Sequence, residues 1–258
     1  MQNLSLQLLL IGCTTVSGFW PQVEHTNIQR IYYITKGSGC YFDPDGTSHP
    51  FTAGTLYVFP YNFISNFYSN PHDPFEHLFL EFISSPPLIS EDPVIHPVTP
   101  GSSLEKLLAY IVSFLKAGNF SPRERSGITG NSEPRLEQRI MFECLQLLLL
   151  QIEAEHPLPF AADHDISDVL RYIHEHFGEN LRVEALAEHY GYTTEHFIRR
   201  FRKIMKITPG AYIQTFRLLT ADQLIQGGMS VTEAALRCGY NNASSLSRAL
   251  SKHRNRYK

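Results

Sequence analysis

Two stretches near the end of the chain carry the same arrangement of chemically useful residues. Residues 183–192 correspond to residues 231–240, about 48 positions later, and each stretch has small residues followed by a Gly-Tyr pair. A basic residue follows in both, Arg199 in the first stretch and Arg248 in the second. A guanidinium group can donate two hydrogen bonds to O6 and N7 of guanine. The repeated pattern therefore indicates a protein that reads the edges of DNA bases.

The elements that must position these arginines are two helix-turn-helix units. Ala187 and Ala235 permit two helices to cross closely, and Gly191 and Gly239 provide the turn between them. The second helix of each unit is expected in the major groove, with its first turns facing the bases. The residues predicted to contact bases are Thr194, Glu195, Ile198, Arg199, Ala243, Ser244, Ser247 and Arg248, while Arg202 and Lys203 are predicted to contact phosphates.

The charge of the chain is distributed in a way that favours the same interpretation. The net charge is -3, but before Asp165 there are 8 basic and 16 acidic residues, net -8, and from Asp165 onward 14 basic and 9 acidic residues, net +5. A basic helix face is often merely solvated. The duplicated unit on a net-positive segment favours DNA over that alternative.

Residues 183–257 resemble the AraC/XylS family of bacterial transcription regulators. That resemblance implies a domain of two helix-turn-helix units joined by a long helix, with Glu195, Ile198 and Arg199 of the first unit facing the bases. It also implies a cupin-like effector-binding barrel in the N-terminal part, and RNA polymerase as a partner if the protein is an activator. The matching segments are Leu186-Ala187, Gly191-Tyr192, residues 199–203, residues 208–212, residues 217–221, residues 233–235, residues 238–240 and residues 247–250.

The chain departs from the family pattern near its end. Leu250 replaces the usual phenylalanine, and residues 253–258 replace a closing Gly-x-Ser/Thr-Pro-x-x-Tyr pattern. We therefore expect the last supporting helix to be short or missing. The alternative function is a small-molecule binding protein with an impaired DNA-binding half, acting through protein partners.

Periodicity predicts an α+β protein. Short β-type runs separated by glycine and proline turns fill residues 5–83, and helical spacing begins near Leu104. Capping signals in the last part include Thr208-Pro209 and the Ser230–Glu233 capping box. The predicted parts are an effector-binding barrel (1–100), a helical connector or dimerisation segment (101–155), a linker (156–164) and the double helix-turn-helix domain (165–258).

The helix predicted near residues 135–155 is apolar around more of its circumference than a solvent-facing helix. One stripe contains Leu136 and Leu147, and the other contains Leu145 and Leu149. Both stripes could be intramolecular core, or one could be the interface of a homodimer. We expect the dimer, with charge at Leu147 or Leu149 as its check.

The barrel is expected to bind a small, sugar-like or otherwise polar effector. The predicted effector-binding residues are Trp20, Asn66, His77 and Phe79, of which Asn66, His77 and Phe79 rest on resemblance to sugar-binding members. The histidines His25, His49, His72 and His77 show no paired metal-ligand spacing, so we expect no catalytic metal, no cofactor and no enzyme. His174 and His176 are expected on the surface.

Four cysteines lie far apart, and the longest apolar stretches fall short of the ~18 residues that cross a bilayer. This pattern predicts a cytoplasmic protein with reduced thiols and no membrane partner.

Overall fold

The computed structural model describes residues 5–16, 18–20, 28–43, 45–61, 63, 65–90, 92–118, 136–160, 164–226 and 228–255. These residues form two compact units. The N-terminal unit comprises residues 6–83 and 90–159, and the C-terminal unit consists mainly of residues 160–258 together with residues 84–89.

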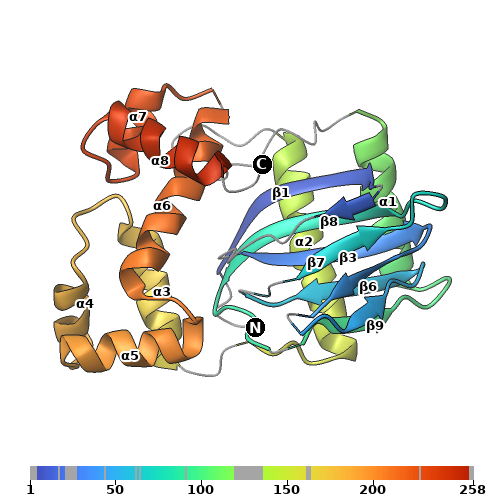
Figure 1. Cartoon of the computed structure of the whole chain (residues 1–258), viewed down its shortest axis with the longest axis horizontal. Coiled ribbons are helices and arrows are strands. Elements are labelled where there is room, and N and C mark those ends of the chain that lie inside the picture. The colour runs from blue at the N-terminus through green and yellow to red at the C-terminus, as the bar shows by residue number, and fades with distance from the viewer. Residues whose placement is uncertain are drawn as a thin grey trace. The chain divides into compact units, whose positions relative to one another are not determined.

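The N-terminal unit contains two β-sheets (Figure 1). The strand order is β1-β8-β3-β6-β9 in one sheet and β2-β7-β4-β5 in the other. β3 pairs antiparallel with β6 and β8, and β7 pairs antiparallel with β2 and β4. The strands are β1 (Ser5–Thr15), β2 (Gly18–Trp20), β3 (Gln29–Lys36), β4 (Gly39–Phe42), β5 (Ser48–Pro50), β6 (Thr55–Phe59), β7 (Asn66–Ser69), β8 (Glu76–Ser85) and β9 (Val94–Pro97).

An aromatic cluster joins the two sheets. β3 and β6 contribute Tyr32 and Phe59 from the five-stranded sheet, and β4 and β7 contribute Tyr41 and Phe67 from the four-stranded sheet. Alternate residues of one strand share a face, so Ile34 joins Tyr32 on β3 and Tyr57 joins Phe59 on β6. The buried members of this cluster are Tyr32, Ile34, Tyr41, Phe51, Tyr57, Phe59, Phe67 and Phe75.

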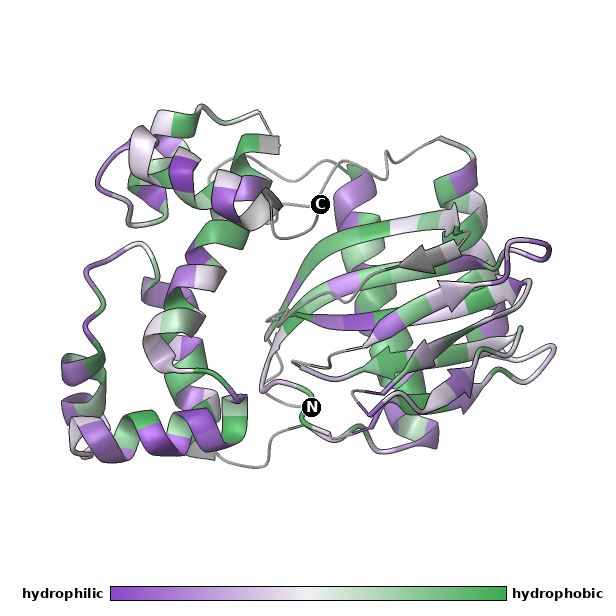
Figure 2. Cartoon of the chain, viewed as in Figure 1, coloured by the Kyte–Doolittle hydropathy of each residue, from purple (hydrophilic) through white to green (hydrophobic). Residues whose placement is uncertain are grey.

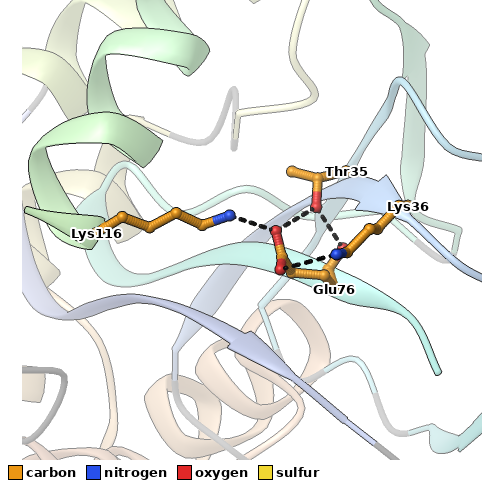
Figure 3. A network of polar contacts seen from close by, with 4 residues as sticks. All are labelled: Thr35, Lys36, Glu76 and Lys116. Carbon is orange, nitrogen blue, oxygen red and sulfur yellow. Dashed lines mark hydrogen bonds and ion pairs between the residues drawn. The ribbon is translucent and has the colours of Figure 1, made fainter.

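Two helices, α1 (Ser103–Lys116) and α2 (Leu136–Glu155), complete the N-terminal unit. In Figure 3, Nζ of Lys116 at the end of α1 lies 2.7 Å from Oε1 of Glu76 at the start of β8. Thr35 donates to the same carboxylate over 3.1 Å, and Nζ of Lys36 lies 3.6 Å from it. Because Glu76 contacts Lys116 of α1, its face of β8 is directed toward α1. Leu78 shares that face, away from the aromatic cluster.

The C-terminal unit is entirely helical in its described residues from 164 onward. The long helix α6 runs between the α4–α5 pair and the α7–α8 pair (Figure 1). The helices are α3 (His164–His176), α4 (Val183–His189), α5 (Thr194–Met205), α6 (Pro209–Gln226), α7 (Val231–Arg237) and α8 (Ala243–Asn255). The predicted α+β class is confirmed, whereas the boundaries of the four functional parts stay a prediction.

Helix α2 is buried along one side and exposed along the other. Leu145 and Leu149 are fully buried, but Leu147 and Leu136 have exposed fractions of 49% and 69%. Green, hydrophobic segments recur along the ribbon of α2 in Figure 2. Leu149 is therefore a core residue of its own chain, and of these two leucines Leu147 is the one that suits a test of association.

The expected surface position of His174 is wrong. Its Nε2 lies 2.6 Å from Oη of Tyr212, and its ring stacks on Phe216 with the ring centroids 4.3 Å apart. Burial lowers the pKa of His174 to about 3. The sequence did not reveal this because both contacts come from α6, about 40 residues away.

Candidate nucleic-acid interface

The two helix-turn-helix units repeat each other at the level of individual backbone hydrogen bonds. In the first unit, Gly191 N donates to Glu188 O over 3.0 Å and Tyr192 N donates to Ala187 O over 2.8 Å. In the second unit, the corresponding bonds run from Gly239 N to Leu236 O and from Tyr240 N to Ala235 O, over 3.3 and 2.8 Å.

The glycines at the two turns adopt the same conformation. Their φ angles are +72° at Gly191 and +73° at Gly239, in the left-handed region that favours glycine. Ala187 and Ala235 are buried in the preceding helices, where their small side chains permit close helix crossing. The predicted helix-turn-helix elements are therefore present in both copies.

Each reading helix begins with a side-chain cap. The hydroxyl of Thr193 accepts a hydrogen bond from His196 N at the start of α5, and Oδ1 of Asn242 accepts one from Ser245 N at the start of α8. These bonds satisfy amides that lack a partner within the helix. The one-residue offset between the two caps matches the extra residue predicted in the second unit.

Apolar residues hold the inner face of each reading helix. Phe197 and Phe201 of α5 are buried, as are Leu246 and Leu250 of α8. Leu250 packs in the same cluster as Cys238 of the preceding turn. Leu250, which departs from the family pattern, and Leu246 are therefore part of the core of the second unit.

The outer face of each helix carries the predicted DNA contacts. Glu195, Arg199, Arg202 and Lys203 are exposed on α5, whereas Thr194 and Ile198 are half-buried. On α8, Ser244, Ser247 and Arg248 are exposed and Ala243 is half-buried. The structure thus groups the predicted residues of each unit on one helix, with a basic side chain exposed in both.

The structure adds His196 to the candidate surface of α5. Its side chain is exposed, and its ring lies edge-on to Tyr192 with the centroids 5.0 Å apart. Arg200 instead donates to Oη of Tyr192 over 2.9 Å and lies over the same ring. Capping by Thr193 was the signal that could have placed His196 in the first turn.

The candidate effector site lies in the aromatic cluster of the N-terminal unit. The imidazole of His77 is fully buried, with its centroid 4.7 Å from that of Tyr32 and 5.1 Å from that of Phe75. Phe79 follows on the same face, 5.7 Å from His77. Burial lowers the pKa of His77 to about 4 and raises that of Tyr32 to about 12, so both rings are neutral at pH 7.

The other two predicted effector residues are placed differently. Asn66 is half-buried in β7 and lies on the opposite face of the strand from Phe67, which belongs to the aromatic cluster. Trp20 of β2 pairs through its backbone with Phe67 of β7, and the side chain of Trp20 lies outside what the structure describes. His77 and Phe79 are therefore the two that the structure brings together.

Among the residues that the structure describes, no cluster of three or more His, Cys, Asp and Glu side chains is arranged to hold a metal ion. Within the described ranges, no helix combines the length and apolar character needed to span a bilayer. His25 lies outside these ranges.

A family model described as a helix-turn-helix domain matches residues 186–256. The transcriptional activator RhaS of Salmonella arizonae is 30% identical over 128 residues, which are 48% of this chain and 45% of RhaS. The uncharacterised regulator YbfI of Bacillus subtilis is 30% identical over 82 residues, which are 32% of this chain and 30% of YbfI.

The helix-turn-helix domain at the C-terminal end of the chain is of the AraC type, as the predicted resemblance implies. The AraC-type domain contains all of α5 and α8, the helices that carry the exposed arginines. The chain spans less than half the length of the curated relatives that it matches.

A likeness in structure extends beyond the AraC-type domain. ToxT from Vibrio cholerae O395 matches with a TM-score of 0.59 at 13% identity, covering 96% of this chain and 94% of that one. At this identity the likeness shows the fold alone, an α+β chain with an N-terminal β part and C-terminal helix-turn-helix units.

Proposed function

We propose that this protein is a sequence-specific, DNA-binding transcription regulator that responds to a small-molecule effector. The observation that supports it most strongly is the repeated pair of capped helices, each with a buried apolar face and an exposed arginine, Arg199 in α5 and Arg248 in α8. Two such helices on one chain read two segments of the major groove, about 10 base pairs apart on one face of the duplex.

The two sides of α5 have different tasks in this proposal. Arg199 and Glu195 read base edges, since arginine donates to guanine and a carboxylate accepts from cytosine N4. Arg202 and Lys203 neutralise phosphates and fix the position of the helix without reading sequence. His196 joins this surface as a further hydrogen-bonding group.

Selection of bound sequences from random DNA tests the proposal with the full chain. We expect a site of two segments, and Arg199→Ala should cost about 1–3 kcal/mol of binding free energy and relax specificity at one base pair. Lys203→Ala should instead weaken binding to all sequences and reduce the salt dependence by about one phosphate contact.

A matched control keeps the loss of charge separate from the loss of base reading. Arg171 is exposed on α3 and pairs with Asp168 over 2.7 Å, outside both reading helices. Arg171→Ala should leave the sequence preference unchanged. Equal preference of the Arg199→Ala variant and the parent for the selected site would refute the assignment of α5.

The effector is proposed to bind in a cupin-like barrel, within the aromatic cluster around His77 and Phe79. Tyr32, Phe75 and His77 lie at ring-packing distances, so a ligand must displace or share these ring contacts. Each hydroxyl of a sugar needs a hydrogen-bond partner when buried. The abundance of rings therefore favours an effector with an apolar body and few polar groups over the polyhydroxylated effector expected from resemblance.

Binding of oleate and of glucose, measured by calorimetry, tests this preference. We expect oleate to bind more tightly than glucose. We also expect His77→Leu, which replaces the imidazole by an apolar side chain of similar size, to change the affinity. Leu78→Met alters the opposite face of β8 and serves as the control. Tighter binding of glucose would refute the apolar effector while leaving the DNA-binding proposal intact.

The effector acts by binding one state of the protein more tightly than another. A ligand with equal affinity for the DNA-binding and non-binding states would shift nothing. The selected site should therefore be bound more tightly, or less tightly, in the presence of the effector. Because AraC-type regulators of this kind act on chromosomal DNA, we propose the cytoplasm as the location.

We further propose a homodimer formed through α2. The exposed residues Leu136, Leu147 and Leu150 recur with Ile140 at intervals of three, four and seven residues, the spacing of a helix seam. Leu147 and Leu150 have exposed fractions of 49% and 48%, although both are leucines in the middle of a helix. A partner helix would remove this apolar stripe from water.

Sedimentation of the full chain tests the dimer. The double variant Leu147→Glu with Leu150→Glu should sediment as a monomer, since four buried carboxylates would face one another across a twofold interface. Tyr110→Glu places a charge at an exposed aromatic position on α1 and should leave the dimer intact. A parent that is monomeric at micromolar concentration would contradict the proposal.

A further inference from the structure

Arg217 of α6 lies where three elements of the C-terminal unit meet. Its Nε donates to Phe177 O and its Nη2 donates to Glu179 O, each over 2.6 Å. Phe177 O lies directly after the last residue of α3, where a helix leaves acceptors without partners and where a cation is favoured. Glu179 O lies two residues further along and also accepts from Leu181 N. One guanidinium therefore joins α6 to the end of α3 through two short hydrogen bonds.

The turn of the second helix-turn-helix unit packs directly on this joint. A Cβ added to Gly239 would lie 3.0 Å from Cζ of Arg217 and 3.0 Å from Gly178 O. A Cβ added to Gly178 would lie 2.5 Å from Arg237 O, at the end of α7. The end of α3, the guanidinium and the α7–α8 turn are thus in contact at positions where glycine leaves just enough room.

Helix α3 also contacts the first unit. The ring of Tyr172 stacks on that of His189 in α4, with centroids 5.3 Å apart. At its other end, Phe177 packs against the buried cluster of the second unit. The position of α3 relative to α6 therefore affects both reading units, and Arg217 fixes the end of α3 that bears on the second.

We infer that Arg217 is a positioning residue that sets the separation and rotation of α8 relative to α5, and hence the spacing of the two DNA segments that the chain reads. This inference rests on the proposed DNA-binding function. Arginine suits the task because its planar fork can span two carbonyls, whereas the single ammonium of lysine cannot hold both in the same geometry. The side chain touches no DNA in this role.

The spacing between the two DNA segments is a sensitive measure of how firmly Arg217 fixes α6 to the end of α3. Each base pair added between two segments moves them apart by about 3.4 Å and rotates them by about 35°. A rigid pair of reading helices cannot follow that change, so the second helix loses its base contacts. For the parent we expect roughly tenfold or more weaker binding when one base pair is inserted or removed.

The experiment measures the affinity of the full chain for the selected site and for versions with one or two base pairs inserted or deleted between its segments. Arg217→Lys should reduce the parent's preference for one spacing to less than about threefold, while affinity for a single segment stays close to that of the parent. Arg171→Lys makes the same change on the exposed face of α3 and should retain the parent's spacing preference.

A second variant alters the joint with Arg217 in place. Gly178→Ala would force the α7–α8 turn away from α3, so the preferred spacing should broaden or shift even if Arg217→Lys fails to fold. Circular dichroism identifies variants that are folded. An effect confined to spacing separates positioning from loss of stability, because a partly unfolded protein loses affinity for all sites equally.

The outcomes are distinct. If folded Arg217→Lys and Gly178→Ala variants keep the parent's spacing preference, or if the parent binds its site without any spacing preference, the role of Arg217 is overturned. If the parent selects no sequence from random DNA, the proposed function fails, and this inference fails with it. A lost spacing preference in both variants supports the positioning role.

Discussion

The burial of His174 makes the stability of the C-terminal unit depend on pH. Burial against Phe216 holds the pKa of His174 at about 3, whereas a histidine in an unfolded chain has a pKa near 6.5. The folded state therefore keeps the ring neutral while the unfolded state takes up a proton below about pH 6.5. Stability is highest above that pH and falls as the pH decreases from about 6.5 toward 3.

The size of the effect follows from the two pKa values. At pH 5 the unfolded state binds nearly one more proton than the folded state, which gives a slope of about 1.4 kcal/mol per pH unit. Integrated from pH 7 to pH 5, the loss of unfolding free energy is about 2 kcal/mol. This loss of unfolding free energy is an upper limit, because part of the His174 side chain stays accessible to water.

Urea unfolding of the parent and of His174→Phe, followed by circular dichroism at several pH values, measures this loss. His77 is buried in the N-terminal unit and adds its own acid dependence, so the quantity to compare is the difference between the two proteins. The variant should lose up to about 2 kcal/mol less than the parent between pH 7 and pH 5.

A second substitution separates burial from hydrogen bonding. Tyr212→Phe removes the hydroxyl 2.6 Å from Nε2 of His174 but keeps the ring that covers it. Because burial is the cause of the lowered pKa, this variant should keep the acid dependence of the parent. Equal slopes for the parent and His174→Phe would refute the reasoning.

Three further measurements test other parts of the structure. Ser230→Ala removes the side chain that accepts from Glu233 N and should lower the free energy of unfolding by about 1 kcal/mol in urea titrations, whereas an unchanged midpoint would contradict a stabilising cap. Phe201→Ala empties a fully buried position behind α5 and should cost about 3–5 kcal/mol, with loss of DNA binding at temperatures where the parent still binds. The Lys116 ammonium holds the pKa of Glu76 below its usual range, so Lys116→Met should raise that pKa in an NMR titration. A constant pKa would contradict this role of Lys116 and would show that Thr35 and Lys36 alone lower the pKa of Glu76.

Much of the C-terminal unit could be predicted from the sequence because its signals are local. The capping box at Ser230 and the turn glycines Gly191 and Gly239 depend on residues within one or two helical turns of each other. The repeat strengthened these local signals because the same Gly-Tyr turn occurs in both copies. The structure shows the same backbone bonds in each copy. The reading face of α5 followed from the same periodicity, although His196 was missed.

The N-terminal unit was predicted less completely. Alternation along β8 correctly placed His77 and Phe79 on one face, but it did not show that this face meets a cluster of rings from both sheets. The resemblance predicted Asn66 as an effector-binding residue but did not indicate that Asn66 lies on the opposite face of β7 from Phe67. Strand pairing decides which faces meet, and pairing partners here lie tens of residues apart.

The sequence by itself determined that β-type runs precede helices, that Ser230 caps a helix of the second unit, and that residues 165–258 contain two related units with a net positive charge. Tertiary structure alone decided that Leu149 is buried while Leu147 is exposed, that His174 lies against α6, and that Arg217 joins α6 to the end of α3. Periodicity along one helix states which residues share a face. It does not state what covers that face, because the covering atoms come from segments about 40 residues away.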